Sequence, residues 1–412
     1  MAYKVAGIDV HKKVLMVVVL DVSDPQAEPQ RRRFTTLPSD LRQLSTWLRG
    51  QGVRQAVMES TAQYWRPVWY ELEPYMELQL AQAFSNRAPR GRKHDFRDAE
   101  RLVRRLLAGE LTLSFVPEPE QRTWRTITRM KVQLTEDKSR LHSQLECLLE
   151  EMRIKLSSVI SDLLGVSGYR ILRALAGGET DAKKLAELGD DRLQCTDQQL
   201  VDALSGSPQP AHLQLLAFYL DRHQMLVAQI SKLDGMIAEA LKPHQEAVAR
   251  LALAPGFGVD SAQQIIAEVG ADAGTFPSPG HLSAWVGTCP GQNQSAEENY
   301  GSCSPKGNRY VRRILNQAAH AAVKTKGSHF QAVFRRLLPR LGYNAAIWAV
   351  AHKLTRLVWK ILHEAVPYVE QGSEPDPKTK HRRARKMLAT LRKMGYQVSI
   401  KPLTPTPATA AV

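Results

Sequence analysis

The sequence has few cysteines and no long hydrophobic run. Its four cysteines lie far apart and form no Cys-x-x-Cys pair: Cys147, Cys195, Cys289 and Cys303. That spacing predicts reduced thiols in a reducing compartment. It does not match the ligand spacing of a zinc site built from Cys289, Cys303 and a nearby histidine. The longest aliphatic run, Val14 to Leu20, has seven residues, whereas a membrane-spanning helix needs about 20, so we expect no membrane partner.

The N-terminus also lacks an export signal. The opening residues MAYKVAGIDV contain no basic segment, no apolar segment of signal-peptide length and no small-residue cleavage site. We therefore expect a cytoplasmic protein. Of the 412 residues, 43% are hydrophobic and 24% are charged, which excludes a mainly disordered or fibrous chain and allows two or three domains.

Acidic residues are scarce in the last quarter of the chain. Residues 301–412 contain 21 of the 56 Lys and Arg residues but only 4 of the 41 Asp and Glu residues. That quarter therefore has a net charge of +17, whereas residues 1–300 are close to neutral. We expect a polyanion such as a nucleic acid to bind the C-terminal quarter.

The first hundred residues alternate short apolar runs with helical patterns, which is typical of an α/β fold. The expected strands cover residues 4–10, 14–21, 32–37, 54–58 and 77–82. Ser39 and Asp40 are expected to cap a first helix, and further helices are expected over residues 64–72 and from about Phe96 to Leu107. A meander of three strands followed by strand and helix alternation predicts a mixed sheet flanked by helices.

The middle of the chain predicts long helices, so the overall class is α/β plus α. Residues 121–164 have leucines at helical spacing and no internal Pro or Gly, and residues 213–241 repeat this pattern. Short helices are expected between them, broken at Gly177-Gly178 and over residues 205–210. The two long helices can pack as an internal hairpin that acts only as a spacer, or they can form a coiled-coil dimer interface. Mainly helical residues follow, and a basic, Pro-containing tail from residue 373 is expected to order only on a partner.

Four carboxylates stand where an α/β nuclease would place metal ligands. Asp9 lies in the first apolar strand, where an unpaired buried carboxylate is costly, and Glu59 ends the fourth strand, where α/β folds bind ligands. Asp95 and Asp98 are one turn apart at the start of the third helix. These oxygen ligands suit two Mg²⁺ ions. Each acid alone has an ordinary alternative, such as complementing a helix dipole or capping a turn.

A glycine-containing turn precedes a helix expected over residues 261–269. The sequence PGFG at residues 255–258 is typical of a helix-hairpin-helix, whose free backbone N–H groups bind phosphate. Gly256 and Gly258 are the candidate contacts. A plain tight turn explains the two glycines equally well.

A polar loop over residues 287–309 contains three candidate nucleophiles, Ser295, Ser302 and Ser304. A serine hydroxyl attacks a phosphodiester only when a base, a metal ion or neighbouring cations activate it. The residues alone do not choose among the three, and hydroxyls that cap turns are the plainer explanation.

The chain resembles the insertion sequence 110 (IS110) family of transposases. Five segments occur in the family's order over most of residues 4–366: GIDVHK, MEST, KHDFRDA, PGFG followed by AEVG, and PGQNQSAE through KGNRYVRR. The resemblance implies a RuvC-like, ribonuclease-H-type DEDD domain over residues 1–116 and a helical coiled-coil region over residues 117–249. It also implies a transposase domain with a helix-hairpin-helix-like segment and a catalytic serine over residues 250–372, followed by the basic tail over residues 373–412.

The resemblance also implies the chemistry. Asp9, Glu59, Asp95 and Asp98 would bind Mg²⁺, and Ser295 would join covalently to DNA as a 5′-phosphoserine, leaving a free 3′-hydroxyl. The sequence contains no Gly-x-x-x-x-Gly-Lys-Ser/Thr phosphate loop, which fits rejoining without ATP. Two alternatives remain: a junction-resolving nuclease whose carboxylates activate water, and an inactive nucleic-acid-binding protein.

The partners implied are donor and target double-stranded DNA and a structured noncoding bridge RNA. Further copies of the chain are implied in a dimer or a dimer of dimers, in a bacterial cytoplasm and associated with the nucleoid when active. The candidate nucleic-acid contacts are Gly256, Gly258, Lys306, Arg309, Arg312, Arg313, Arg335, Arg336, Arg382, Arg383, Arg385 and Lys386.

Two positions depart from the family pattern. His94 stands where the family often has Thr, and Glu297-Glu298 follows Ser295-Ala296, where basic residues are usual. A cation that stabilises the reacting phosphate would then come from Lys306 or Arg309.

Overall fold

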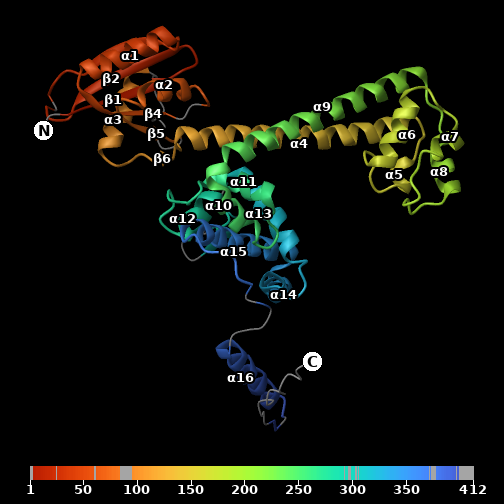
Figure 1. The fold of residues 1–412 in the computed structure, drawn as a ribbon. Helices are drawn as coiled ribbons and strands as arrows, with labels where there is room; N and C mark the ends of the chain where they lie inside the picture. The colour runs from red at the N-terminus through yellow and green to blue at the C-terminus, as the bar shows by residue number, and fades with distance from the viewer. Residues whose placement is uncertain are drawn as a thin grey trace. The chain divides into compact units, whose positions relative to one another are not determined.

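The computed structural model describes residues 3–24, 26–59, 62–83, 95–291, 293–295, 298–301, 304, 306–370, 372, 377–395 and 397–398. The chain divides into two compact units, Met1–Glu118 and Pro119–Val412 (Figure 1). Among the described helices, none combines the length and the apolar character that crossing a membrane requires.

The first unit is built on a six-stranded mixed sheet (Figure 1). Its spatial order is β3-β2-β1-β4-β5-β6. The strands are β1 Lys4–Val10, β2 Val14–Asp21, β3 Gln30–Thr35, β4 Val53–Glu59, β5 Glu77–Ala81 and β6 Leu113–Ser114. The first three strands form an antiparallel meander, and β1, β4 and β5 run parallel. The predicted mixed sheet is confirmed, although the two-residue β6 is too short to leave a pattern in the sequence.

Helices cover both faces of this sheet. The helices α1 (Pro38–Gly50) and α2 (Trp65–Leu72) pack on one face, and α3 (Asp95–Leu107) packs on the other. The prediction that Ser39 and Asp40 cap α1 is wrong. The helix begins with Pro38, which has no N–H group to satisfy, and the Asp40 carboxylate accepts a hydrogen bond from the backbone N–H of Thr35 at 3.0 Å.

The second unit contains an antiparallel pair of long helices, α4 (Pro119–Glu151) and α9 (Pro210–Ala240). They lie side by side in Figure 1 and share an apolar cluster of Leu134, Leu141 and Leu226. Lys131 of α4 is ion-paired with Asp234 near the end of α9, which fixes their opposite directions. The internal hairpin, one of the two arrangements that the sequence allows, therefore forms within one chain, and a dimer interface on these helices stays a prediction.

The prediction that the first long helix continues to residue 164 is wrong. The helix α4 ends at Glu151, because Arg153 takes a left-handed conformation with φ 59° and the N–H of Ile154 bonds back to the carbonyl of Leu149 at 2.9 Å. Short helices follow: α5 Leu156–Val159, α6 Val166–Ala176, α7 Ala182–Ala186 and α8 Asp197–Leu204. The helices α6 and α8 end at Gly177 and Ser205, as predicted. The four short helices share one apolar core with the neighbouring ends of α4 and α9.

The rest of the second unit is mainly helical. Its elements are η1 Lys242–His244, α10 Gln245–Ala252, α11 Val259–Val269, α12 Pro279–Val286, β7 Asn293–Ser295, β8 Glu298–Gly301, α13 Arg309–Ala322, α14 His329–Leu341, α15 Tyr343–His363 and α16 Pro377–Lys393. The helices from α10 through α15 share one apolar core, to which Trp124 and Ile127 of α4 also contribute. Part of the tail is the helix α16, whose Lys, Arg, Ala and Leu residues favour a helix. That the tail orders only on a partner stays a prediction.

Candidate functional site

Two of the predicted metal ligands lie at adjacent strand ends on one face of the sheet. The parallel register pairs Gly7 with Val57 and Ile8 with Met58, so Asp9 and Glu59 are neighbours where β1 and β4 end. Side chains alternate between faces along a strand. Asp9 and Glu59 therefore share the face of Val57, which packs with α3.

Gly7 determines how closely α3 approaches this face. A Cβ atom on Gly7 would lie 2.1 Å from the carbonyl oxygen of Ala99 and 2.7 Å from a methyl carbon of Val103. Only glycine allows such an approach. The close packing brings Asp98, the residue before Ala99, to the end of the sheet that carries Asp9.

The electrostatics of Asp9 reflect this convergence. Its side chain is only 13% exposed, and one oxygen lies 3.1 Å from Nε2 of His11. Burial raises the pKa of Asp9, the charge and hydrogen bond of His11 lower it, and the negative charges of Asp98 and Glu59 raise it, with a net upward shift. Asp98 is 14% exposed and also pairs with Arg101 at 2.8 Å. Three carboxylates thus share one partly buried region.

These carboxylates have the chemistry of a site for a divalent cation. Carboxylate oxygens are the ligands that Mg²⁺ prefers, and their repulsion is relieved when a cation binds between them. Asp95, the fourth predicted ligand, is the first residue of α3, but its side chain lies outside the described part of the structure. Among the described side chains, no group of three already stands at metal-binding distance.

The PGFG turn joins α10 to α11, in the order that a helix-hairpin-helix requires. Gly256 has φ +83°, and a Cβ there would lie 2.2 Å from the carbonyl oxygen of Ala318 in α13. The N–H of Gly258 donates to Oγ of Ser261 at 2.8 Å, at the start of α11. Packing and helix capping thus account for both glycines, and their predicted phosphate contact remains a prediction.

The predicted nucleophile Ser295 is the last residue of β7, which pairs with β8 in a short hairpin. Its side chain is outside the described residues, as are Ser302, Ala296 and Glu297. Ser304, which follows this hairpin, lines a cavity of about 510 Å³. The other lining residues are Lys306, Gly307, Arg309, Arg312, Arg313, Asn316 and Trp348. Four cations from one short segment therefore surround a space where an anion fits.

The arginines of this basic pocket are held in place by neighbouring groups. Arg312 lies over the ring of Trp348, 4.4 Å from its centroid, and donates to the carbonyl of Gly287. Arg313 donates to Oε1 of Gln264 at 2.7 Å, while its buried Nε atom has no hydrogen-bond partner among the described residues. Guanidinium groups held in this way present planar sets of N–H donors, which suit a phosphate oxygen.

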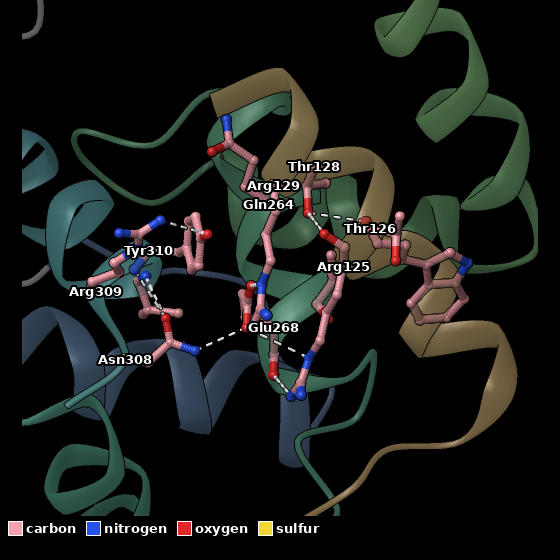
Figure 2. A network of polar contacts seen from close by, with 12 residues as sticks. Arg125, Thr126, Thr128, Arg129, Gln264, Glu268, Asn308, Arg309 and Tyr310 are labelled. Carbon is pink, nitrogen blue, oxygen red and sulfur yellow. Dashed lines mark hydrogen bonds and ion pairs between the residues drawn. The ribbon is translucent and has the colours of Figure 1, made fainter. Parts of the chain in front are cut away.

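A buried network that the sequence analysis does not predict supports this pocket (Figure 2). At its centre is Glu268 of α11, whose side chain is 2% exposed. The carboxylate accepts two hydrogen bonds from Arg129 of α4, at 2.7 and 2.9 Å, and one from Nδ2 of Asn308 at 2.8 Å. Oδ1 of Asn308 in turn accepts from the backbone N–H groups of Tyr310 and Val311 and caps α13.

Arg125 of α4 completes the network. Its Nε atom lies 3.5 Å from Oε2 of Glu268. Nε also donates a hydrogen bond to the backbone carbonyl oxygen of Ala267 at 3.2 Å, and Nη2 donates one to the backbone carbonyl oxygen of Glu268 at 2.5 Å. Burial lowers the pKa of Arg125 to about 10, although the attraction of Glu268 opposes this shift. Glu268 lies in the segment AEVG and Asn308 in the segment KGNRYVRR, both quoted above for the family resemblance. The acid in the otherwise apolar sequence IIAEVG was the one sequence feature that could have indicated a buried polar network. The network fixes α4, α11 and the start of α13 relative to one another.

The remaining predicted nucleic-acid contacts are on two other helices. Arg335 and Arg336 are exposed on α14. Arg382, Arg385 and Lys386 are exposed on α16, and the side chain of Arg383 is outside the described residues. These cations are available to a polyanion, but they do not line the basic pocket.

Comparisons with known proteins point in one direction. Residues 6–154 match a DEDD-type IS110 transposase model, and residues 248–335 match a model described as "Transposase IS116/IS110/IS902 family". The chain is 26% identical over 369 residues to the "Probable family 20 transposase" of Pseudomonas aeruginosa, covering 88% of this chain and 97% of that protein. It is 31% identical over 134 residues to the transposase for insertion sequence element IS1111A of Coxiella burnetii, covering 32% of this chain and 36% of that protein.

Proposed function

Because the chain belongs to the IS110 family of transposases, whose two domain models both match it, we propose that it cuts and rejoins donor and target DNA through a covalent phosphoserine intermediate. The observation that carries the proposal is the convergence of Asp9, Glu59 and Asp98 on one face of the sheet. The basic pocket that follows the β7–β8 hairpin supports it independently.

The carboxylates would hold Mg²⁺, with Asp95 as the fourth ligand. A bound divalent ion would supply Lewis-acid polarisation of a phosphate oxygen. The Asp9 carboxylate would be kept ionised by the cation and oriented by its contact with His11, 3.1 Å away.

Ser295 would act as the nucleophile. Its Oγ would form a bond to phosphorus while the bond from phosphorus to the 3′-oxygen breaks, and the proton lost from the serine would pass to solvent as the 3′-oxygen takes one up. Lys306, Arg309, Arg312 and Arg313 would stabilise the charge that gathers on the phosphoryl oxygens. Attack of a 3′-hydroxyl on the phosphoserine would reverse the step and join the strands.

The decisive test is a search for a protein–DNA adduct that survives denaturation, using labelled donor and target DNA with Mg²⁺. We expect the adduct with the unaltered protein, none with Ser295→Ala, and a loss of at least about 100-fold with Asp9→Asn. Ser302→Ala is a matched control that keeps the adduct. An adduct retained in Ser295→Ala would refute the assignment of the nucleophile.

The same assay separates the two alternatives. A junction-resolving nuclease would cut DNA without any adduct, and Ser295→Ala would leave its hydrolysis intact while Asp9→Asn abolishes it. A protein that only binds nucleic acid would show neither product, and Asp9→Asn would leave its binding unchanged.

We further propose that a structured bridge RNA guides the reaction and that several copies of the chain act together. Support comes from the +17 charge of residues 301–412, since Lys and Arg bind phosphates of any sequence and leave the choice of site to another component. Purifying the full chain and sequencing the nucleic acid bound to it tests this directly. A specific RNA is expected, and random cellular RNA alone would contradict the proposal.

A further inference from the structure

A second cavity lies away from the basic pocket, between the start of α14, the second half of α15 and the segment that follows α15. Its volume is about 580 Å³, within the range of small-molecule sites. One side is apolar: Phe330 and Ile361 are buried there, and Leu357 and Tyr368 are partly buried. The rings of Phe330 and Tyr368 stack with their planes 22° apart.

The other side of this cavity is cationic. Lys353, Arg356 and Lys360 are exposed and follow one another at intervals of three and four residues, so they form a stripe along one face of α15. Lys360 lies 4.0 Å from Glu364, whereas Lys353 and Arg356 make no ion pair with another described residue. Burial lowers the pKa of His329, and the charge of Lys353 lowers it further, so the positive potential also reaches the start of α14.

The wall opposite this stripe is a segment held by a single carboxylate. After α15 the chain reverses at Ala365, which has φ 53°. Glu370 then accepts hydrogen bonds from the backbone N–H of His329 at 2.9 Å, from the hydroxyl of Tyr368 at 2.7 Å and from the backbone N–H of Gly372 at 2.8 Å. The cavity is therefore preformed, because its walls are fixed before any ligand enters.

We propose that this cavity binds one nucleotide of a single-stranded nucleic acid, with the base on the apolar side and the adjoining phosphates on Lys353 and Arg356. An apolar surface beside unpaired cations is the combination that single-strand binding proteins use, since bases stack on rings and phosphates pair with Lys and Arg. A duplex keeps its bases stacked inside and would reach only the rim of the cavity.

This inference goes beyond the proposed function, because a single strand can bind here whichever residue is the nucleophile. The site uses neither Ser295 nor the carboxylates. A binding assay in EDTA therefore tests it separately from the adduct assay, so that failure of one leaves the other standing.

The experiment measures binding of fluorescein-labelled hexanucleotides of thymidine and of uridine to the full chain, by anisotropy, from about 50 to about 200 mM salt. We expect the double variant Lys353→Ala/Arg356→Ala to weaken binding at least about tenfold. The slope of log Kd against log salt should fall by about 0.7 for each phosphate contact removed. Tyr368→Ala, which keeps every charge, should weaken binding without changing the slope.

The matched control is Lys183→Ala/Lys184→Ala on α7, which removes two positive charges elsewhere. It should leave affinity within about twofold if the cavity is the site. Equal losses in the two double variants, or none in either, would overturn the proposal. The thymidine and uridine oligonucleotides distinguish a DNA strand from an RNA strand as the natural occupant.

Discussion

Gly7 and Ala99 touch so closely that a single added methyl group on Gly7 would lie 2.1 Å from the Ala99 carbonyl oxygen. The first strand and α3 are therefore in backbone contact next to Asp9 and Asp98. The spacing of those two carboxylates depends on this contact, because the absence of a side chain at Gly7 sets how closely the helix approaches the strand.

Replacing Gly7 with alanine should push α3 away from β1. We expect a loss of stability of about 1–3 kcal/mol from overpacking and a fall in DNA cleavage of at least about tenfold, since small displacements at a catalytic site are costly. Thermal unfolding and cleavage assays measure the two effects. Gly50→Ala is the control, because a Cβ at Gly50 meets nothing within 4 Å; an equal response of both variants would rule out the spacing role.

Asp9→Asn should stabilise the metal-free protein at neutral pH. The pKa of Asp9 is raised on folding, so the folded state binds its proton more tightly than the unfolded state does. Stability therefore falls as pH rises from the unfolded pKa through the raised value, and the asparagine variant escapes this loss.

The measurement is the difference in Tm between Asp9→Asn and the unaltered protein in EDTA. We expect a higher Tm for Asp9→Asn at neutral pH, with a difference that shrinks as the pH falls toward the unfolded pKa of aspartate, about 4, and also when Mg²⁺ is added to the unaltered protein. A variant that is less stable than the unaltered protein at neutral pH would show that burial and the neighbouring carboxylates do not destabilise the charged form of Asp9.

Glu268→Gln should destabilise the second unit by about 3 kcal/mol, because it leaves the partly buried cations Arg125 and Arg129 without their buried counter-charge. Urea unfolding measures this cost. The control Glu239→Gln removes an acid that is 77% exposed and that, among the described residues, pairs with Lys242 at 3.6 Å, and it should cost less than about 1 kcal/mol. Similar costs for both would mean that the buried network contributes little.

Arg312→Lys should lower adduct formation by about 100-fold while leaving the fold intact. Lysine keeps the charge but loses both the stacking on Trp348 and the planar set of donors that reach Gly287 and Ser304. The readout is the rate of adduct formation at saturating DNA. Arg335→Lys on the exposed face of α14 should change that rate less than twofold, and a lysine variant of Arg312 with full activity would contradict the role of the basic pocket.

The sequence predicts most of the sheet well, because each of the five longer strands has a strong local signal. Residues 4–10 and 14–21 were expected as strands and are β1 and β2, and the approximate ends of the other long strands also agree. What the sequence does not show is non-local. The early end of α4 depends on the conformation of Arg153, and β6 exists only through its pairing with β5.

Some residues of the candidate site could be predicted from local sequence, and others depend on contacts between distant parts of the chain. Asp9 and Glu59 could be expected together, since parallel strands end at one edge of a sheet. The network around Glu268 could not, because its partners lie 139 to 143 residues earlier on α4 and 40 residues later at Asn308. The cavity beside α15 likewise depends on how the segment after α15 folds back, which local periodicity does not encode.

The antiparallel pairing of α4 and α9 has a consequence for how the protein can vary. The chain leaves along one helix and returns along the other, so the core of α5 to α8 begins and ends at neighbouring points. Equal insertions of about seven residues, or two turns, in both helices would lengthen the pair and keep its apolar seam in register. The same insertion in one helix alone would shift its apolar residues by about 10 Å along the axis and out of register with their partners. The core of α5 to α8 is thus a replaceable module, and its size can change without disturbing the network at Glu268.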